Sequence, residues 1–167
     1  MKLAIDVGYY ENGATAAGVL FKNWDDAKPE KEIRAKITEI APYEPGQFYK
    51  RELPCIEQLL KLVSVDLDTI VVDGFVWLSD DPNEPRPGLG AHLFETLEQK
   101  TVVIGVAKTE FAGSGSTQLL RGTSKRPLFV TAVGMKKEAA TERIRTMHGK
   151  NRIPTLLKQV DTLSRIV

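Results

Sequence analysis

The chain has 167 residues, 42% of them hydrophobic and 27% charged, with a formal net charge of +1. This balance is ordinary for a globular domain and excludes an overall basic field that would attract nucleic acid, although a local basic patch stays open. No apolar run approaches the ~18 residues of a membrane span. The acidic Asp6 interrupts the first apolar run too early for a signal peptide. We therefore expect a single cytoplasmic domain over residues 1–167, without membrane association.

The first forty residues contain three segments that predict β-strands, at 3–7, 14–21 and 33–40. The first two are short and apolar. The third alternates in polarity with the period of two that is typical of a strand. The strands are joined by a turn-like Glu-Asn-Gly and by a polar loop that contains Pro29. Sequential strands with short connections favour an antiparallel meander.

The remaining chain alternates helices with buried strands. A long acidic loop is expected over residues 74–87, and a mobile segment rich in Gly, Ser and Thr over residues 113–126. Three antiparallel strands followed by strand–helix units predict an α/β fold, in which helices flank a mixed sheet. This is the order of a ribonuclease H-like domain. The helices are expected at 51–62, 89–97, 136–147 and 154–166, and the later strands at 69–72, 102–106 and 128–131.

Two of the expected strands end on an aspartate. Asp6 closes the first apolar run, and Asp73 closes the strand at 69–72 just before Gly74. Each could simply begin a turn, and Glu52 could simply favour the positive end of a helix dipole. Because open α/β sheets place their chemistry at strand carboxyl ends, we expect Asp6, Glu52 and Asp73 to converge. Crowded carboxylates raise one another's pKa unless a cation lies between them, so convergence would imply a metal such as Mg²⁺.

Two further residues have both an ordinary and a functional interpretation. Lys108, after the strand at 102–106, is either a solvated lysine or an ammonium near the metal site, where it could hold a phosphate or leaving oxygen. Tyr43 stands between Pro42 and Pro45. A core aromatic is the usual interpretation, but so rigid a loop presents its side chain to the surface, where it could stack on a base or wedge into a strand.

Five short segments of the sequence together resemble the motifs of a known protein family. They are Asp6-Val7-Gly8-Tyr9, Pro42-Tyr43-Glu44-Pro45-Gly46 with Arg51-Glu52, Val72-Asp73-Gly74, Gly88-Leu89-Gly90-Ala91-His92-Leu93, and Ile104-Gly105-Val106-Ala107-Lys108. In this order they resemble the segments of the endonuclease V family. The Pro-Tyr-x-Pro-Gly…Arg-Glu and Gly-Val-Ala-Lys blocks are the most specific. The later Pro127-Leu128-Phe129-Val130-Thr131 and Arg152-Ile153-Pro154 fall where the family has a strand and an Arg-x-Pro helix start.

The resemblance implies Mg²⁺-dependent cleavage, with Mn²⁺ as a substitute, of nucleic acid containing deaminated bases, chiefly inosine. Family enzymes cut the second phosphodiester on the 3′ side of the lesion, in DNA repair. By motif match, Asp6, Glu52 and Asp73 would be the metal-binding and catalytic carboxylates. Lys108 would be the catalytic lysine, and Tyr43 the wedge that holds the strand open behind the flipped base.

The same match implies a set of nucleic-acid contacts. The glycines of Val72-Asp73-Gly74 and Gly88-Leu89-Gly90 would admit the flipped base close to backbone. Extruding a base costs a few kcal/mol, least for a poorly paired one, which is a source of lesion selectivity. DNA is the expected partner, with RNA as the alternative, and a monomer is expected. The full set of contact residues is Tyr43, Pro45, Gly46, Arg51, Gly74, Arg86, Gly88 and Gly90.

The chain departs from the family at three histidines. Phe75, Glu84 and Met135 stand where the family usually has histidine. Histidines near a metal can position water or shuttle protons, so their loss predicts weakened or altered activity. We do not expect His92 or His148 to replace them, because both match positions within or near helices.

Three functions stay open at this point. The first is a Mg²⁺-dependent endonuclease for inosine-containing nucleic acid, favoured by the retained carboxylates and Lys108. The second is a binding module of the same fold that recognises such nucleic acid without cutting it, favoured by the missing histidines. The third is a nuclease for flaps or junctions, favoured by the diverged loop at 74–87.

Overall fold

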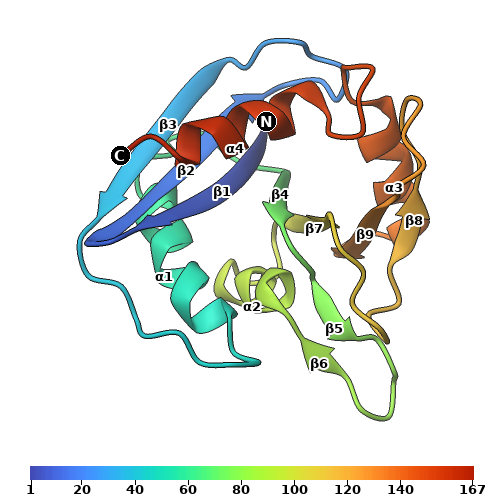
Figure 1. Ribbon diagram of the computed structural model, residues 1–167, viewed down its shortest axis with the longest axis horizontal. Helices are drawn as coiled ribbons and strands as arrows, with labels where there is room; N and C mark the ends of the chain where they lie inside the picture. The colour runs from blue at the N-terminus through green and yellow to red at the C-terminus, as the bar shows by residue number, and fades with distance from the viewer.

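The computed structural model describes residues 1–167 (Figure 1). Seven strands form one mixed sheet, a two-stranded hairpin stands apart, and four helices are present. The strands of the sheet are β1 (Lys2–Tyr10), β2 (Gly13–Phe21), β3 (Lys31–Ile37), β4 (Thr69–Asp73), β7 (Val102–Ala107), β8 (Thr117–Leu119) and β9 (Leu128–Val133). The hairpin is β5 (Trp77–Ser79) with β6 (Arg86–Pro87), and the helices are α1 (Tyr49–Leu60), α2 (Leu89–Thr96), α3 (Lys137–Thr146) and α4 (Thr155–Ser164).

The sheet has the mixed topology that the sequence predicts. Its strand order is β3-β2-β1-β4-β7-β9-β8. The first three strands form an antiparallel meander, and β4 and β7 run parallel to β1. β9 then returns antiparallel to β7, and β8 antiparallel to β9. The carboxyl ends of β4 and β7 therefore meet at one edge of the sheet, where α/β proteins place their sites, and β1 continues past this edge to Tyr10.

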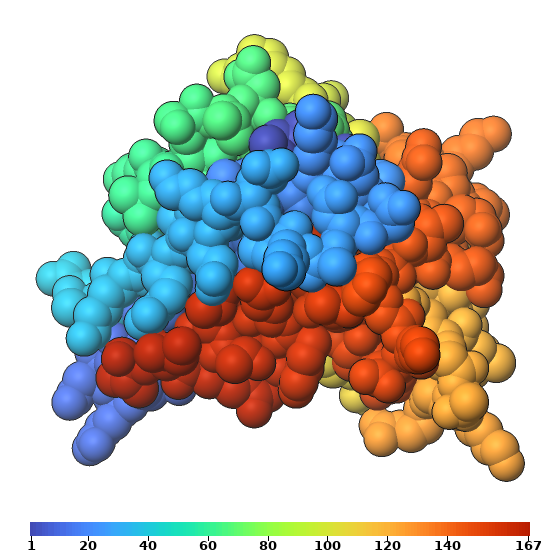
Figure 2. Space-filling view, turned by 90° about the horizontal axis from the view of Figure 1, so that it is seen from above, coloured from blue at the N-terminus to red at the C-terminus, as the bar shows by residue number.

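Helices cover both faces of the sheet, so the central strands are buried on both sides. Along β4, Ile70 and Val72 pack with α1 and α2, whereas Val71 packs with α3 and α4. This alternation follows from the period of two of a strand. Figure 1 shows α4 lying across β1 and β2 on the face opposite α1. In Figure 2 the C-terminal segment lies directly against the N-terminal strands and their connecting loop.

Two segments expected to lack regular structure do contain strands. The loop at 74–87 forms the hairpin β5–β6, and the segment at 113–126 contains β8. The expected mobility of the second segment does not fit its packing, because Leu119 and Arg121 are buried. Short strands rich in polar residues have no hydrophobic alternation, so sequence periodicity misses them. None of the four helices has the length and apolar character that a membrane crossing requires.

Candidate active site

The parallel pairing of β1 and β4 brings two aspartates together. The register pairs Ile5 with Val72, so Asp6 and Asp73 are the next residues of adjacent strands. Neighbouring strands lie about 4.7–4.9 Å apart. Both aspartates have the parity of Ala4 and Val71, which pack against the helices α3 and α4. Asp73 ends β4, as the sequence predicts, but Asp6 lies within β1, which continues to Tyr10, so the expectation that Asp6 closes its strand is wrong. The expected proximity of the two carboxylates is confirmed by the register.

Helix α4 contributes a third carboxylate, Asp161, which the sequence analysis missed. Its side chain is 14% exposed and pairs with Arg165 at 3.2 Å and Lys158 at 3.8 Å. Ser164, one turn further along, lies 2.9 Å from Asp6 Oδ2 and 2.8 Å from the Asp161 carbonyl, so its hydroxyl can donate to either. An aspartate on an amphipathic helix has no local signal of function, because only the packing of α4 across β1 places it here.

The three aspartates and Lys108 line one cavity of about 380 Å³, which we call the carboxylate cavity. Lys108 follows β7, and its Nζ lies 3.8 Å from Asp73 Oδ2. Both side chains are about half exposed, so this ion pair contributes little to stability. The ion pair matters for function instead, because it holds the Lys108 ammonium at the sheet edge where the carboxylates lie.

Glu52 reaches this edge from the other side of the sheet. It lies on α1, is 7% exposed, and accepts a hydrogen bond from Tyr9 Oη at 3.0 Å. The preceding Arg51 stacks its guanidinium over the Tyr9 ring at 4.0 Å, and its Nε is buried with no hydrogen-bond partner. Glu52 is not among the residues that line the carboxylate cavity. The expected trio is therefore brought to one edge, but from both faces of the sheet.

Burial makes the carboxyl groups at this edge hard to ionise. It raises the pKa of Asp6 to about 6, with Asp73 and Asp161 adding to the rise and the Ser164 hydrogen bond opposing it. It raises the pKa of Glu52 to about 8, opposed by the hydrogen bond from Tyr9. The pKa of Asp73 is also raised by burial, with Lys108 opposing. A cation among these groups would relieve their desolvation and mutual repulsion.

The chemistry of these donors fits a hard divalent cation, because all are carboxylate oxygens. The carboxylates are, however, not yet close enough together to coordinate one ion. No group of three or more His, Cys, Asp or Glu side chains is drawn together closely enough to hold a metal ion. The site is thus an assembly of acidic side chains that would still have to close around an ion.

Replacing Glu52 with Gln is expected to stabilise the metal-free protein at pH 8. The ordinary Glu pKa of 4.5 is raised to about 8 in the folded state. Between these values the folded protein keeps a proton that the unfolded chain has lost, so the free energy of unfolding falls as the pH rises. Glutamine has no charge to desolvate. It should add roughly 2–4 kcal/mol at pH 8 and flatten the pH dependence.

The measurement is urea unfolding at pH 5, 6.5 and 8 in the presence of a chelator. Glu57→Gln is the matched control, because Glu57 is exposed on the same helix. A Glu52→Gln protein no more stable than wild type at pH 8 would contradict the burial argument.

A second cavity, of about 310 Å³, opens on Asp73 from the side of α1 and α2. We call it the apolar cavity. Gly74 lies in its wall with φ of +134°, a backbone conformation that other residues rarely adopt. Its lining residues are Gly46, Phe48, Tyr49, Asp73, Gly74, Phe75, Leu78, Gly88, Leu89 and Phe111. Asp73 belongs to both cavities, so a group held in the apolar cavity would lie beside the carboxylates.

Comparison with known proteins decides the family. A sequence profile described as Endonuclease V matches residues 3–153. The chain belongs to the endonuclease V family. Endonuclease V of Xanthomonas axonopodis pv. citri (strain 306) is 35% identical over 112 residues, and that of Xanthomonas oryzae pv. oryzae (strain PXO99A) is 31% identical over 110. Each match covers 65% of this chain but only 44% of the relative.

Solved endonuclease V structures have the same fold. A variant from Ciona intestinalis, in complex with a 23-mer DNA containing an inosine followed by a ribo-adenosine, superposes with a TM-score of 0.79 at 20% identity. That comparison covers 98% of this chain and 83% of the other. Human ENDOV gives a TM-score of 0.76 at 22% identity, covering 98% and 82%. The mixed sheet flanked by helices is thus the endonuclease V fold.

The other nucleic-acid contacts that the family motifs predict do not all lie at the two cavities. Gly88 lines the apolar cavity as expected, but Gly90 is buried, and a Cβ there would meet Val76 at 2.6 Å. The absence of a Cβ thus lets α2 pack closely against Val76 at this position. Arg86 is exposed on the β5–β6 hairpin and lines neither cavity. Pro45 is exposed in the loop before α1.

Two of the three histidine replacements do not line either cavity. Phe75 does, and its ring packs against Phe111 with centroids 6.0 Å apart. Met135 follows β9, whose last residue Val133 pairs with Val103 near the start of β7. Met135 therefore lies at the opposite edge of the sheet from Lys108. A side chain at this position therefore lies away from the carboxylate cavity, because β9 runs antiparallel to β7. Glu84 is exposed in the hairpin turn.

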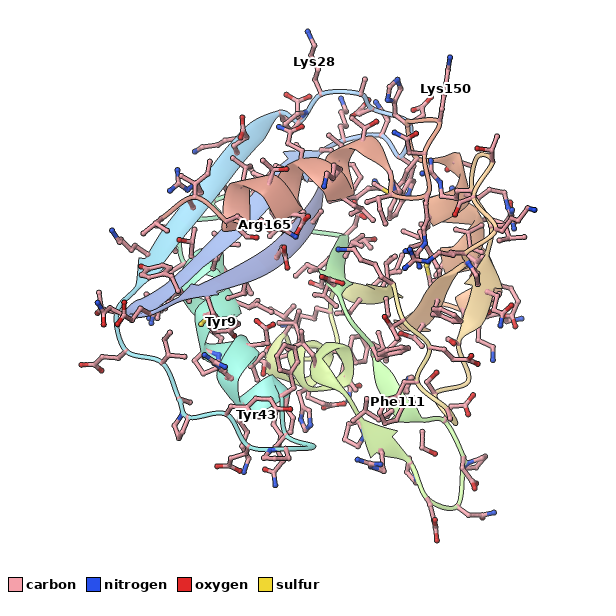
Figure 3. All side chains as sticks on the ribbon, in the orientation of Figure 1. Tyr9, Lys28, Tyr43, Phe111, Lys150 and Arg165 are labelled. Carbon is pink, nitrogen blue, oxygen red and sulfur yellow. The ribbon has the colours of Figure 1, made fainter.

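Tyr43 projects from the surface, as expected, and is 59% exposed (Figure 3). It lies in the loop before α1, the helix that carries Glu52. Replacing it with Ala should weaken binding of inosine-containing nucleic acid by about 1–3 kcal/mol, the worth of one aromatic–base stack. The free energy of unfolding should change little. Fluorescence anisotropy and urea unfolding measure the two effects, with Leu120→Ala, another exposed apolar side chain, as the control. Unchanged affinity would remove Tyr43 from the interface.

Proposed function

We propose that this chain is a divalent-cation-dependent endonuclease that cleaves nucleic acid containing deaminated bases, chiefly inosine. The cut would fall at the second phosphodiester 3′ to the lesion, in DNA repair. The observation that carries this proposal is the shared wall of two cavities at Asp73. One cavity gathers three carboxylates and an ammonium, as phosphodiester hydrolysis needs. The other has the glycine-lined, apolar walls that a flipped base needs.

Asp6, Asp73 and Asp161 would hold the cation, with Glu52 joining from α1. Mg²⁺ is the proposed ion, and Mn²⁺ should substitute for it. When bound, such an ion supplies a more acidic water and polarises the phosphate. The protein itself would orient the carboxylate oxygens that bind the ion. Ser164 directs one Asp6 oxygen, and Tyr9 Oη directs one Glu52 oxygen.

Lys108 would stabilise the charge that develops on the phosphate or the leaving oxygen. Its ammonium is already held at the cavity edge by Asp73. A positioned donor of this kind stabilises the transition state more than the ground state. Phe75 and Phe111 would support the flipped base through apolar contact in the second cavity. Arg51, whose guanidinium stacks on the Tyr9 ring beside Glu52, would contact a backbone phosphate.

DNA is the proposed partner, with RNA as the alternative. The Ciona intestinalis complexes, in which endonuclease V is bound to DNA containing an inosine followed by a ribo-adenosine, support an inosine-containing ligand for this chain as well. A monomer is the proposed functional unit.

A second function, binding without cleavage, is favoured by two observations. The carboxylates do not form a compact metal-ligating group, and the raised pKa of Glu52 favours its neutral form at pH 7. A chain that cannot close around an ion would still hold a base in the apolar cavity.

A cleavage assay separates the two functions. Oligonucleotides with one inosine, as single-stranded DNA, duplex DNA and RNA, are incubated with Mg²⁺, Mn²⁺ or a chelator, and the products are mapped. The nuclease proposal predicts one cut at the second 3′ phosphodiester, lost with the chelator, with Mn²⁺ at least as effective as Mg²⁺. Specific binding of the inosine strands without any cut would establish the binding module. A flap or junction oligonucleotide tests the third function.

A further inference from the structure

Two arginines without acidic partners organise the backbone behind the carboxylate cavity. Arg152 comes just before α4 and directs its guanidinium at three main-chain carbonyls. Its Nη2 donates to the Lys108 carbonyl at 2.5 Å and to the Pro127 carbonyl at 2.8 Å, and its Nε donates to the Arg126 carbonyl at 3.0 Å. No carboxylate lies within ion-pair distance of it, so its hydrogen bonds go entirely to the backbone.

Arg121 holds the segment from which Arg152 projects. It is 6% exposed and donates to the carbonyls of Met147 at 2.7 Å and Asn151 at 2.6 Å. Weaker contacts at 3.2 and 3.4 Å reach Gly149 and Arg152. A buried guanidinium that satisfies several carbonyls fixes a turn that has no helix or sheet ladder of its own. Arg121 therefore fixes the backbone of the segment that carries Arg152.

The contacts of Arg152 fall where the sheet ends. The last pair of the β7–β9 ladder joins Ala107 to Phe129, so Lys108 and Pro127 lie beyond the paired residues. Strand ends without ladder hydrogen bonds move more than the strand interior. The fork of Arg152 bridges these two unpaired ends and replaces the missing ladder. Because the Lys108 side chain is long and flexible, its backbone position determines where the ammonium can reach.

We propose that Arg152 is a positioning residue for Lys108, with Arg121 as its support. This inference rests on the proposed function, since it gives Lys108 a task in cleavage. Arg152 acts through the Lys108 carbonyl and does not touch the reacting phosphate. Two of its three donating groups, Nε and Nη2, are already engaged by carbonyls, which leaves little capacity for a direct phosphate contact.

The first test measures the backbone and needs no activity. Hydrogen–deuterium exchange is followed by mass spectrometry in wild type, Arg152→Ala and Arg152→Lys. Lysine keeps the charge but loses the planar fork, so both variants should exchange faster over residues 107–113 while the central strands stay protected. Arg145→Ala is the control, because Arg145 is exposed on α3 and pairs only with Glu142. Unchanged exchange over residues 107–113 in both variants would overturn the proposal.

The second test is a double-mutant cycle on single-turnover cleavage of an inosine oligonucleotide. Arg152→Lys should lower the cleavage rate by about 10- to 100-fold, the scale of a small misplacement of a catalytic group, with little change in affinity. In a Lys108→Ala background the same substitution should cost less than about twofold, since the two residues then act as one unit. Equal losses in both backgrounds would show that Arg152 acts independently of Lys108, and would overturn the inference. A wild type that cleaves nothing would refute the proposed function, while the exchange experiment would still decide whether Arg152 holds Lys108.

Discussion

Replacing Asp73 with Asn is expected to abolish cleavage while preserving the binding of inosine-containing nucleic acid. Asp73 lines both cavities and lies beside Asp6 in the parallel register. Asparagine has nearly the same shape but supplies a much weaker ligand for a hard cation. The polarisation that a bound ion supplies is worth several kcal/mol, so the rate should fall at least about 10³-fold. Removing a negative charge near the phosphates should leave affinity equal or improve it.

Single-turnover cleavage and fluorescence anisotropy, measured on the same oligonucleotide, give the rate and the affinity. Asp81→Asn is the matched control, because Asp81 is exposed on the β5–β6 hairpin. A substantial rate in the Asp73→Asn protein would refute the proposed mechanism. Loss of binding together with loss of cleavage would show instead that Asp73 is needed to hold the nucleic acid.

Replacing Lys108 with Ala is expected to lower the cleavage rate at least about 10²-fold, the scale of losing one aimed donor. The ammonium lies 3.8 Å from Asp73 and lines the carboxylate cavity, so its loss removes the cationic side chain beside Asp73, while Arg165 remains beside Asp161. Stability should change little, because both partners of the ion pair are about half exposed.

The matched control is Lys150→Ala, since Lys150 is exposed and projects from the molecule far from Tyr43 and Phe111 (Figure 3). Single-turnover rates at saturating enzyme separate chemistry from binding. If Lys108→Ala and Lys150→Ala slowed cleavage equally, Lys108 would act only through general charge.

The sequence predicts the sheet well because hydrophobic burial dominates its strands. β2 is buried along its whole length, and β4 is buried up to Asp73, so both appear as continuous apolar runs. Asp6 comes to lie beside Asp73 because the two parallel strands start in register, with Lys2 paired to Thr69, although β1 continues past the end of β4. The exposed Tyr43 was predicted from the rigidity that Pro42 and Pro45 impose on its loop.

Features that depend on tertiary packing could not be predicted in the same way. Asp161 reaches the site only because α4 crosses β1, and nothing in its local sequence distinguishes it from a solvated aspartate. The position of Met135 at the opposite edge could not be predicted, because the direction of β9 is decided by its pairing with β7 and not by its composition. The close contact of Gly90 with Val76 likewise appears only in the fold.

In the proposed mechanism, acidic side chains from β1, β4 and α4 close around a divalent cation. Anomalous diffraction from crystals grown with Mn²⁺ tests it most directly. We expect a peak within about 2.5 Å of carboxylate oxygens of Asp6 and Asp73, with Asp161 or Glu52 moved toward it. A crystal in which Mn²⁺ binds elsewhere, or leaves the Asp6–Asp73 edge empty at saturating concentration, would contradict this mechanism.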